Sequence, residues 1–326
     1  MDRNKCMTAV ILAVLLTVTA CAASGTDRQE TAYGEQEDVV WQRILESPEE
    51  DRRVETFSHD LCVIDGDEAE PDSSVEAAAA AVFSLDSGEV VLARGAFERL
   101  YPASMTKVMT ALVAIRHGNL KDQVTVGEEC VITEPGATLA HIQPGDTLTM
   151  EDLLYGLMLP SGNDAGAAIA VHISGSIEAF SELMNEEARK LGATDTHFVN
   201  PHGLHDQNHY TTAYDLYLIF QEALKEPFFR SLVAAPAYTA SIRDQAGAAR
   251  EQAWKNSNKY INGDVSMPGG LTALGGKTGT TSAAGCCLIM GSMDGRQQEY
   301  VSIIMKAPDR NKLYDGMTNI IQKVVN

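Results

Sequence analysis

Positive charge is scarce in this sequence. Its 326 residues include 25 Lys and Arg against 45 Asp and Glu, which gives a formal net charge of −20. No cluster of Lys and Arg interrupts the acidic background, so the composition argues against a nucleic-acid partner. Hydrophobic residues make up 44% of the chain, which is enough to bury a sizeable core in one large domain or two smaller ones.

Cysteine is also sparse, and no cysteine spacing matches a zinc knuckle. Two of the six cysteines, Cys6 and Cys21, fall in an N-terminal leader. The four that remain are Cys62, Cys130, Cys286 and Cys287. Neighbours on a strand point to opposite faces, so we do not expect Cys286 and Cys287 to bridge each other. We expect buried free thiols.

The leader, residues 1–21, lacks an apolar run long enough to span a bilayer comfortably. A positively charged start precedes the apolar residues 7–18, which is typical of an export signal. It ends in VTAC, which resembles a bacterial lipobox, so we expect a lipid on Cys21; cleavage after Ala22 or Ala23 without a lipid is the alternative. Two acyl chains would hold the protein stably at a membrane. In either case we expect the mature protein outside the cytoplasm.

Residues 22–76 form an acidic segment that we interpret as a tether. Between residues 27 and 76 there are 17 Asp and Glu against 4 Lys and Arg, a composition that favours a solvated, self-repelling chain. As a flexible coil the segment would reach on the order of 40 Å. Residues 61–64 (LCVI) are apolar enough to dock on a folded part.

The remaining residues, 77–326, predict one folded α+β domain. A β-hairpin is expected from 81–85 and 89–93, joined by a glycine-containing turn. Periodicity and end signals predict helices at 103–117, 151–159, 176–191, 212–224 and 311–325. Strands are expected at 276–280, 285–291 and 300–305. Strands at both ends with helices between them suggest an antiparallel sheet with an inserted helical lobe.

The first of three chemical motifs, Ser104-Met-Thr-Lys107, stands at a predicted helix start. Residues three apart share a helix face, so Lys107 could take the proton of the Ser104 hydroxyl and make it a nucleophile. Lys107 must be neutral to do so, and burial together with a second cation, Lys277, would lower its pKa. The alternative is a surface helix with a solvated lysine. Apolar residues at Val108 and Leu112 favour a buried helix instead.

The second motif, Ser161-Gly-Asn163, follows an apolar run and Pro160. Pro, Ser, Gly and Asn alone predict a turn, so by itself this motif carries little functional weight. In a functional interpretation, Ser161 relays a proton between Lys107 and a leaving group. Asn163 would then hydrogen-bond a substrate's backbone amide.

The third motif, Lys277-Thr-Gly279, lies on a predicted strand that opens with two glycines. Glycines let another backbone approach, as a peptide laid along a strand edge would require. Lys277 and Thr278 could hold a free carboxylate, and the backbone N–H of Thr280 could join that of Ser104 as an oxyanion hole. Because strand residues alternate, Lys277 and Thr278 can both reach one cleft only from an edge strand.

Four histidines, at positions 197, 202, 205 and 209, raise the question of a metal site. No helix pattern places them on one face, and the Asn200-Pro201 turn would scatter them. We therefore expect a polar loop flanking an active site rather than a metal site.

With these motifs, the sequence resembles the serine D,D-carboxypeptidases among the low-molecular-mass penicillin-binding proteins, the S11 peptidases, over about residues 78–318. Each motif sits in a longer matching segment. The segments are 101–110 (YPASMTKVMT), 153–164 (LLYGLMLPSGND), 196–204 (THFVNPHGL), 209–215 (HYTTAYD) and 254–258 (WKNSN). The resemblance implies a penicillin-recognising fold, an antiparallel sheet flanked by helices with the cleft between sheet and helical lobe.

The resemblance also implies a reaction and its residues. The terminal D-alanine of peptidoglycan stem pentapeptides would be removed through an acyl-enzyme, without metal or organic cofactor, and β-lactams would acylate the same serine. Ser104 would be the nucleophile, Lys107 the base and Ser161 the relay. The substrate would be bound by Asn163, Lys277, Thr278, Gly279 and Thr280. Residues 77–326 would form the catalytic domain.

The sequence departs from the family in two places. Many relatives continue into a small β-rich domain and an amphipathic membrane-binding helix; here the chain ends soon after the last predicted helix, and a lipid on Cys21 would replace that attachment. Some relatives carry Arg where this chain has Ser257, so carboxylate binding should depend on Lys277, Thr278 and Thr280.

Three alternatives stay open at this point. A serine β-lactamase uses the same motifs, but a fast class A enzyme needs a glutamate, commonly in Glu-x-x-Leu-Asn, and this pentapeptide is absent from the sequence. D,D-endopeptidase activity on cross-bridges would use the same residues. A non-catalytic penicillin-sensing lipoprotein is disfavoured, since all four chemical side chains, Ser104, Lys107, Ser161 and Lys277, are intact.

Overall fold

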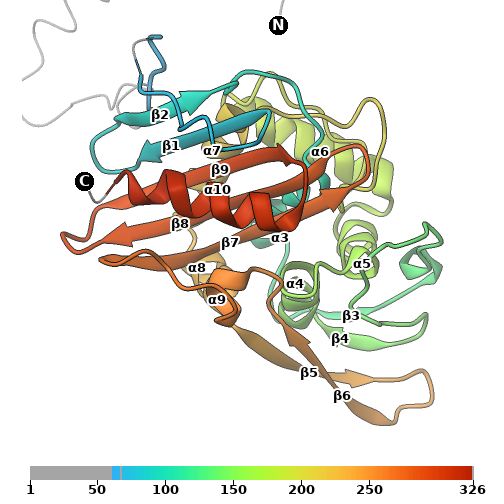
Figure 1. Cartoon of the computed structure of the whole chain (residues 1–326). Coiled ribbons are helices and arrows are strands. Elements are labelled where there is room, and N and C mark those ends of the chain that lie inside the picture. The colour runs from blue at the N-terminus through green and yellow to red at the C-terminus, as the bar shows by residue number, and fades with distance from the viewer. Residues whose placement is uncertain (1–60, 67, 325–326) are drawn as a thin grey trace, which may run out of the picture. The chain divides into compact units, whose positions relative to one another are not determined.

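A computed structural model describes residues 61–66 and 68–324 of the chain. Its centre is a five-stranded antiparallel sheet with the order β2-β1-β9-β8-β7 (Figure 1). The strands are β1 (Ala79–Ser84), β2 (Val90–Arg94), β7 (Leu271–Thr281), β8 (Gly285–Asp294) and β9 (Glu299–Ala307). The predicted hairpin and the three predicted C-terminal strands are confirmed. β7 lies at one edge of this sheet, which matters for the site below.

Alternation along β8 separates the two faces of the sheet. Cys287 and Ile289 belong to a core cluster shared with the helical lobe, whereas Cys286 and Leu288 belong to a cluster under α10 (Arg310–Gln322). Helix α10 therefore covers one face, as Figure 1 shows. The four described cysteines are buried and free, as expected.

The helical lobe is inserted between β2 and β7. Its helices are α3 (Lys107–His117), α4 (Met150–Met158), α5 (Asn163–Ser174), α6 (Ile177–Lys190), α7 (Ala213–Leu224) and α8 (Pro227–Ala234), followed by the short α9 (Lys259–Asn262). Two 3-10 turns, η1 (Ala103–Thr106) and η2 (Glu128–Cys130), complete the helical part. The predicted helices are confirmed to within about a turn, except that the first begins as the 3-10 turn η1. Helices α5 and α8 were not predicted.

A second sheet, also not predicted, has the order β3-β4-β5-β6. Its strands are β3 (Gln123–Thr125), β4 (Thr147–Thr149), β5 (Ala237–Arg243) and β6 (Ala249–Lys255). Most of the β5 and β6 side chains are exposed or half-exposed, so these strands lack the strong apolar pattern that identifies buried strands. Trp254 joins the hairpin to the lobe, because its indole N–H donates to the Ala140 carbonyl at 2.9 Å.

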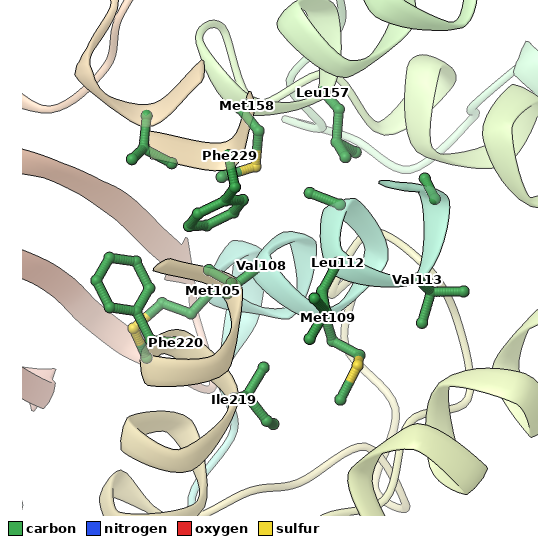
Figure 2. Packing of buried hydrophobic residues seen from close by; sticks show 14 of the residues in the cluster. Met105, Val108, Met109, Leu112, Val113, Leu157, Met158, Ile219, Phe220 and Phe229 are labelled. Carbon is green, nitrogen blue, oxygen red and sulfur yellow. The ribbon is translucent and has the colours of Figure 1, made fainter. Parts of the chain in front are cut away.

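Helix α3 runs through the centre of the lobe. Val108, Leu112 and Val113 are fully buried, and Figure 2 shows them packed among side chains that include Phe220 and Phe229. The prediction of a buried helix behind Ser104 is confirmed. Each fully buried aliphatic side chain contributes about 1.5–3 kcal/mol relative to exposure, so this packing holds both ends of the helix in place.

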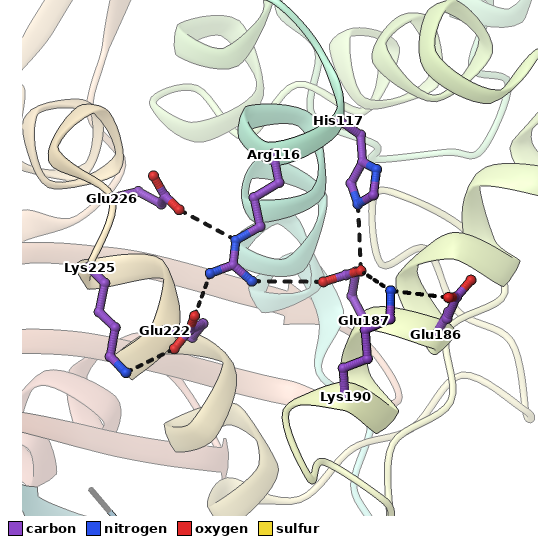
Figure 3. Close-up of polar contacts among 8 residues, drawn as sticks. All are labelled: Arg116, His117, Glu186, Glu187, Lys190, Glu222, Lys225 and Glu226. Atoms are coloured by element: carbon purple, nitrogen blue, oxygen red, sulfur yellow. Dashed lines mark hydrogen bonds and ion pairs between the residues drawn. The ribbon is translucent and has the colours of Figure 1, made fainter. Parts of the chain in front are cut away.

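The C-terminal end of α3 is held by a network of charges (Figure 3). Arg116 is hydrogen-bonded to Glu222 of α7 and lies 3.4 Å from Glu226 and 3.8 Å from Glu187 of α6. Lys190 also reaches Glu187, at 2.8 Å. These pairs tie three helices together on the side of the lobe where α3 ends.

Residues 61–64 dock on the domain, as their apolar character suggested. The Cys62 N–H donates to the Tyr217 hydroxyl at 3.1 Å, and the Tyr214 hydroxyl donates to the Cys62 carbonyl at 2.8 Å. The predicted leader, its lipid site at Cys21 and most of the predicted tether lie outside the described residues. Within 61–66 and 68–324, no helix has the length and apolarity needed to cross a membrane.

Candidate active site

Ser104 lies in a tight turn whose backbone is held in place by neighbouring residues. The residue before it, Ala103, has φ +47°, a left-handed conformation that costs a non-glycine residue of order 1 kcal/mol or more. The Thr106 hydroxyl donates to the Ala103 carbonyl at 2.8 Å. Gly203 lies so close that a Cβ there would stand 1.9 Å from the same carbonyl oxygen. Position 203 must therefore be glycine if the turn is to keep this shape.

A buried histidine completes this support. His209 Nε2 lies 2.8 Å from the Thr106 hydroxyl, and its Nδ1 accepts from the Val199 N–H at 3.2 Å. Because Nδ1 is an acceptor, the ring proton is on Nε2, and the ring donates to Thr106. Burial lowers the pKa of His209 to about 3, so the ring keeps this neutral form throughout the physiological range.

Lys107 is fully buried, with its side-chain nitrogen Nζ beside the serine. Nζ lies 3.0 Å from Ser104 Oγ, 2.6 Å from Asn163 Oδ1 and 2.6 Å from the His202 carbonyl. Burial lowers the pKa of Lys107 well below its usual range, nearby Lys277 lowers it further, and Asp164 partly opposes this. Three acceptors around Nζ would also suit an ammonium. Full burial without a bound carboxylate outweighs this, since desolvation disfavours the charged form most strongly.

The second motif joins α4 to α5. Ser161 has φ +67°, and Asn163 is the first residue of α5. Thr138 holds both, since its hydroxyl donates to the Ser161 carbonyl at 2.6 Å and its carbonyl accepts from the Asn163 N–H at 2.9 Å. Asp164 fastens the same loop by accepting from the Ala140 N–H at 2.8 Å. The motif is thus a fixed corner of the lobe.

Lys277 projects from the edge strand β7 toward this corner. Its Nζ lies 3.0 Å from Ser161 Oγ, and the residue is 1% exposed. Burial lowers the pKa of Lys277 to about 7. Among the described residues, the hydrogen bond of the Ser161 hydroxyl is therefore with Lys277, not with Lys107. The structure thus brings both lysines and both serines of the three motifs together.

The edge position of β7 also brings Thr278 to the same place. The Thr278 hydroxyl lies 2.9 Å from the Ser257 hydroxyl, and both residues line a cleft together with Ser104, Ser161 and Asn163. For Lys277 and Thr278 to reach one cleft, the sequence required an edge strand, and β7 is an edge strand.

The first two glycines of β7 are required by packing within the protein, and not by the approach of a substrate backbone as expected. A Cβ on Gly275 would stand 2.5 Å from a Val233 side-chain atom, and a Cβ on Gly276 would stand 2.2 Å from the Ile289 carbonyl. These two glycines make room for α8 and β8 of the protein itself, not for a substrate. Gly279, in contrast, lies against the backbone of the proposed nucleophile, because a Cβ at this position would lie 3.1 Å from the Ser104 nitrogen.

The cleft has a volume of about 610 Å³, enough for a short peptide. Of the predicted site residues, Ser104, Ser161, Asn163, Thr278, Gly279 and Thr280 line it. His205 also lines the cleft, in agreement with the polar loop expected to flank an active site. Two further charged side chains in the lining, Glu134 and Arg310, were not anticipated. They come from a loop and from the start of α10, and neither stands in a recognisable motif, so no sequence signal could have identified them.

The histidine segment is a loop beside the cleft, not a cluster. His202 and His209 are buried and His197 and His205 are exposed. Burial lowers the pKa of His202 to about 3, and Lys107 lowers it further. In the part of the chain that the structure describes, no group of three or more His, Cys, Asp or Glu side chains could hold a metal ion.

Comparison with known proteins agrees with this geometry. A family model described as Peptidase_S11, D-alanyl-D-alanine carboxypeptidase, matches residues 66–309. The chain is 34% identical over 229 residues to the D-alanyl-D-alanine carboxypeptidase DacF of Bacillus subtilis, covering 68% of this chain and 56% of that protein. It is 32% identical to DacC of Escherichia coli, covering 72% of this chain and 57% of that one. The chain thus spans little more than half the length of these two relatives.

Among solved structures, the fold resembles the DD-transpeptidase of Streptomyces K15. The TM-score is 0.72 at 29% identity, and the match covers 78% of this chain and 98% of the other. A D-alanyl-D-alanine carboxypeptidase from Mycobacterium tuberculosis matches with a TM-score of 0.68 at 30% identity, over 79% of this chain and 96% of that one. The α+β fold inferred from the sequence is confirmed.

Proposed function

Because this chain belongs to the D-alanyl-D-alanine carboxypeptidase family of S11 peptidases, we propose that it is a serine D,D-carboxypeptidase. Its substrates are peptidoglycan stem pentapeptides, from which it removes the terminal D-alanine, and β-lactams block it. The observation that carries the proposal is the buried Lys107 Nζ at 3.0 Å from Ser104 Oγ.

The contacts of Lys107 suit a general base. A neutral amine has two N–H donors and one lone pair. The Asn163 Oδ1 and the His202 carbonyl, each at 2.6 Å, accept the two donors. The lone pair then faces Ser104, whose hydroxyl donates to Nζ. As Ser104 Oγ attacks the carbonyl of the penultimate D-alanine, its proton moves to Nζ, and the bond to the terminal D-alanine breaks.

Ser161 and Lys277 are placed to serve the leaving group. Their hydrogen bond of 3.0 Å supports a step in which Ser161 gives its hydroxyl proton to the departing amine and takes a proton from the Lys277 ammonium. The acyl-enzyme on Ser104 is then hydrolysed by water. Lys107 keeps the Ser104 proton and returns it to Ser104 Oγ during hydrolysis, when the proton lost by the attacking water restores Lys277. Asn163 has its oxygen engaged by Lys107, so its amide nitrogen remains to donate to a carbonyl of the substrate.

The terminal carboxylate lies, in this proposal, between β7 and the base of the cleft. The Thr278 hydroxyl and Lys277 hold it, with Thr280 beside them. Arg310 adds a cation to the same cleft and compensates for Ser257, which cannot bind a carboxylate as arginine does. The close approach of Gly279 to the Ser104 nitrogen supports an oxyanion hole made by the N–H groups of Ser104 and Thr280.

Acylation by a labelled penicillin tests the proposal. We expect stoichiometric mass addition on Ser104, absent in Ser104→Ala, and release of D-alanine from diacetyl-Lys-D-Ala-D-Ala by the intact protein only. A folded wild-type protein that takes up no penicillin would contradict it. Fast, repeated turnover of nitrocefin would indicate a β-lactamase instead.

The enzyme is further proposed to act at the outer face of a bacterial membrane, held by a lipid on Cys21. The sequence of the leader and the acidic segment after it support this. Cys21→Ser should move the protein from the membrane fraction to the soluble fraction without changing its penicillin acylation. Membrane retention of the Cys21→Ser protein would exclude the lipid anchor.

A further inference from the structure

A second hollow lies next to the cleft, near the end of β7. This hollow, of about 240 Å³, is lined by Tyr101, Tyr210 and Lys306, and it shares Ala283 with the cleft. On the opposite wall the two spaces are joined by a ring contact: Tyr101 of the hollow meets His205 of the cleft edge to face, with ring centroids 4.6 Å apart. The hollow therefore adjoins the cleft near the β7–β8 turn.

Lys306 provides a cation in this hollow that has no ion-pair partner among the described residues. It is the exposed residue of β9, and its backbone has φ +60° where the register between β8 and β9 shifts. Such bulges redirect a side chain out of the regular alternation. Among residues 61–66 and 68–324, Lys306 has no ion pair, although the protein's net charge is −20.

The other charged groups of the hollow do not replace it. Arg99 lines the same space, but its guanidinium forms an ion pair with Asp195 at 2.6 Å and lies over the Tyr210 ring. Glu98 is the acidic side chain in the lining; it forms no ion pair with Lys306. Among the described residues that line the hollow, Lys306 is therefore the positive charge without an ion-pair partner, and Tyr101 and Tyr210 line the same space.

The direction of the substrate along β7 leads toward this hollow. In the proposed function the terminal carboxylate lies at Thr278 and the scissile carbonyl lies beside Gly279. The acyl half must then run past Thr281 toward Ala283. At about 3.3 Å per residue, the second and third residues before the scissile bond come level with Thr280 and Thr281. A long side chain that carries a carboxylate would span the remaining distance to the turn that contains Ala283.

We propose that the hollow formed by Tyr101, Tyr210 and Lys306 is a subsite for a carboxylate on the acyl half of the substrate, two or three residues before the scissile bond. This inference rests on the proposed function. In a stem peptide, such a carboxylate comes from one of two sources, the α-carboxyl of an isoglutamyl link or the side-chain carboxyl of a diaminopimelate residue.

Three pentapeptides distinguish these sources. One is L-Ala-D-isoglutamine-L-Lys(Nε-acetyl)-D-Ala-D-Ala, which is neutral in both places. The second has D-isoglutamate in place of isoglutamine, and the third has isoglutamine and meso-diaminopimelate. For each, kcat/KM for D-alanine release is measured with the full-length wild-type protein, Lys306→Gln and Lys306→Arg. Lys121→Gln serves as the control, since Lys121 is also an exposed lysine and lies outside the cleft lining.

We expect the wild-type enzyme to prefer at least one acidic peptide over the neutral one by about fivefold, the contribution of one exposed ion pair. The preference should disappear in Lys306→Gln and persist in Lys306→Arg and Lys121→Gln, and the peptide preferred identifies the source of the carboxylate. Equal kcat/KM for all three peptides in the wild type, or a preference that survives Lys306→Gln, would overturn the subsite while leaving the proposed function intact. Release from none of the peptides would overturn both.

Discussion

The two ends of α3 each carry a basic side chain, and the two side chains lie in opposite surroundings. At the N-terminal end, Lys107 is fully buried and contacts a hydroxyl, an amide oxygen and a carbonyl, and no carboxylate of the described residues hydrogen-bonds to it. At the C-terminal end, Arg116 is partly exposed and faces three glutamates (Figure 3). The surroundings of Lys107 favour loss of its proton, whereas those of Arg116 stabilise the charged guanidinium.

The helix itself adds to this contrast. Its dipole places partial positive charge at the N-terminus, which disfavours an ammonium at Lys107, and partial negative charge at the C-terminus, which favours Arg116. Burial works against the charge of Arg116, but the Glu222 and Glu226 hydrogen bonds raise its pKa overall. One helix therefore carries a potential base at one end and a structural cation at the other.

Exchanging lysine and arginine should separate the two ends most clearly. Lys107→Arg places a guanidinium that cannot be deprotonated, so we expect the rate of penicillin acylation to fall by about a thousandfold, within the range for loss of a general base. Arg116→Lys, the matched exchange, should leave the rate unchanged. Circular dichroism establishes that both variants fold. Retention of the wild-type rate in Lys107→Arg would show that Lys107 is not the base.

Lys277→Met should lose substrate binding and gain stability. Burial lowers the pKa of Lys277 to about 7, while the unfolded chain keeps about 10.4. The unfolded state therefore binds more protons between these values, so the stability of the wild type rises with pH across this window and is lowest below pH 7. We expect Lys277→Met to raise the free energy of unfolding by about 1–4 kcal/mol at pH 6.

The gain should shrink as the pH rises from 7 toward 10, and KM for a D-Ala-D-Ala peptide should increase at pH 6. Chemical denaturation at a series of pH values measures the first effect and D-alanine release the second. A loss of stability at pH 6 would mean that Lys277 is held as a well-compensated ammonium. A stability gain in Lys277→Met that does not depend on pH would contradict the lowered pKa of Lys277.

Arg116→Met gives the smallest expected effect. Its three glutamate partners are themselves partly exposed or surrounded by other cations, and such pairs contribute about 0–1 kcal/mol. We expect the free energy of unfolding to fall by roughly this amount at low salt, with the difference fading in 1 M NaCl and the acylation rate unchanged. A loss above about 3 kcal/mol would mean that the network at this end is more than a surface contact.

The sequence was most informative where a segment packs against the core. The apolar run of β8 and the periodicity of α7 identified both elements close to their observed bounds. The β5–β6 hairpin was missed because its side chains are mostly exposed, so burial left little pattern in it. Helix α5 was missed because its small residues and its start at the Ser161 turn read as a loop.

The residues of the site also fall into two groups, those identified from the sequence and those found only in the structure. The three motifs identified Ser104, Lys107, Ser161 and Lys277, and the fold brings these side chains together; their catalytic roles stay predictions. Arg310 and Lys306 were not identified, since each is a single charged residue with ordinary neighbours in the sequence. The partner of the Ser161 hydroxyl is Lys277, and only the crossing of β7 past the α4–α5 corner decides this.

The sequence by itself determined the chemical groups, the order of the motifs and the antiparallel α+β framework, because residue type and periodicity are local properties. Tertiary structure alone decided that Lys107 is fully buried with two carbonyl oxygens at 2.6 Å, and that β7 lies at a sheet edge beside Ser104. A lysine's pKa depends on what surrounds it from distant parts of the chain. Whether a lysine is a base or a surface charge is therefore settled by packing.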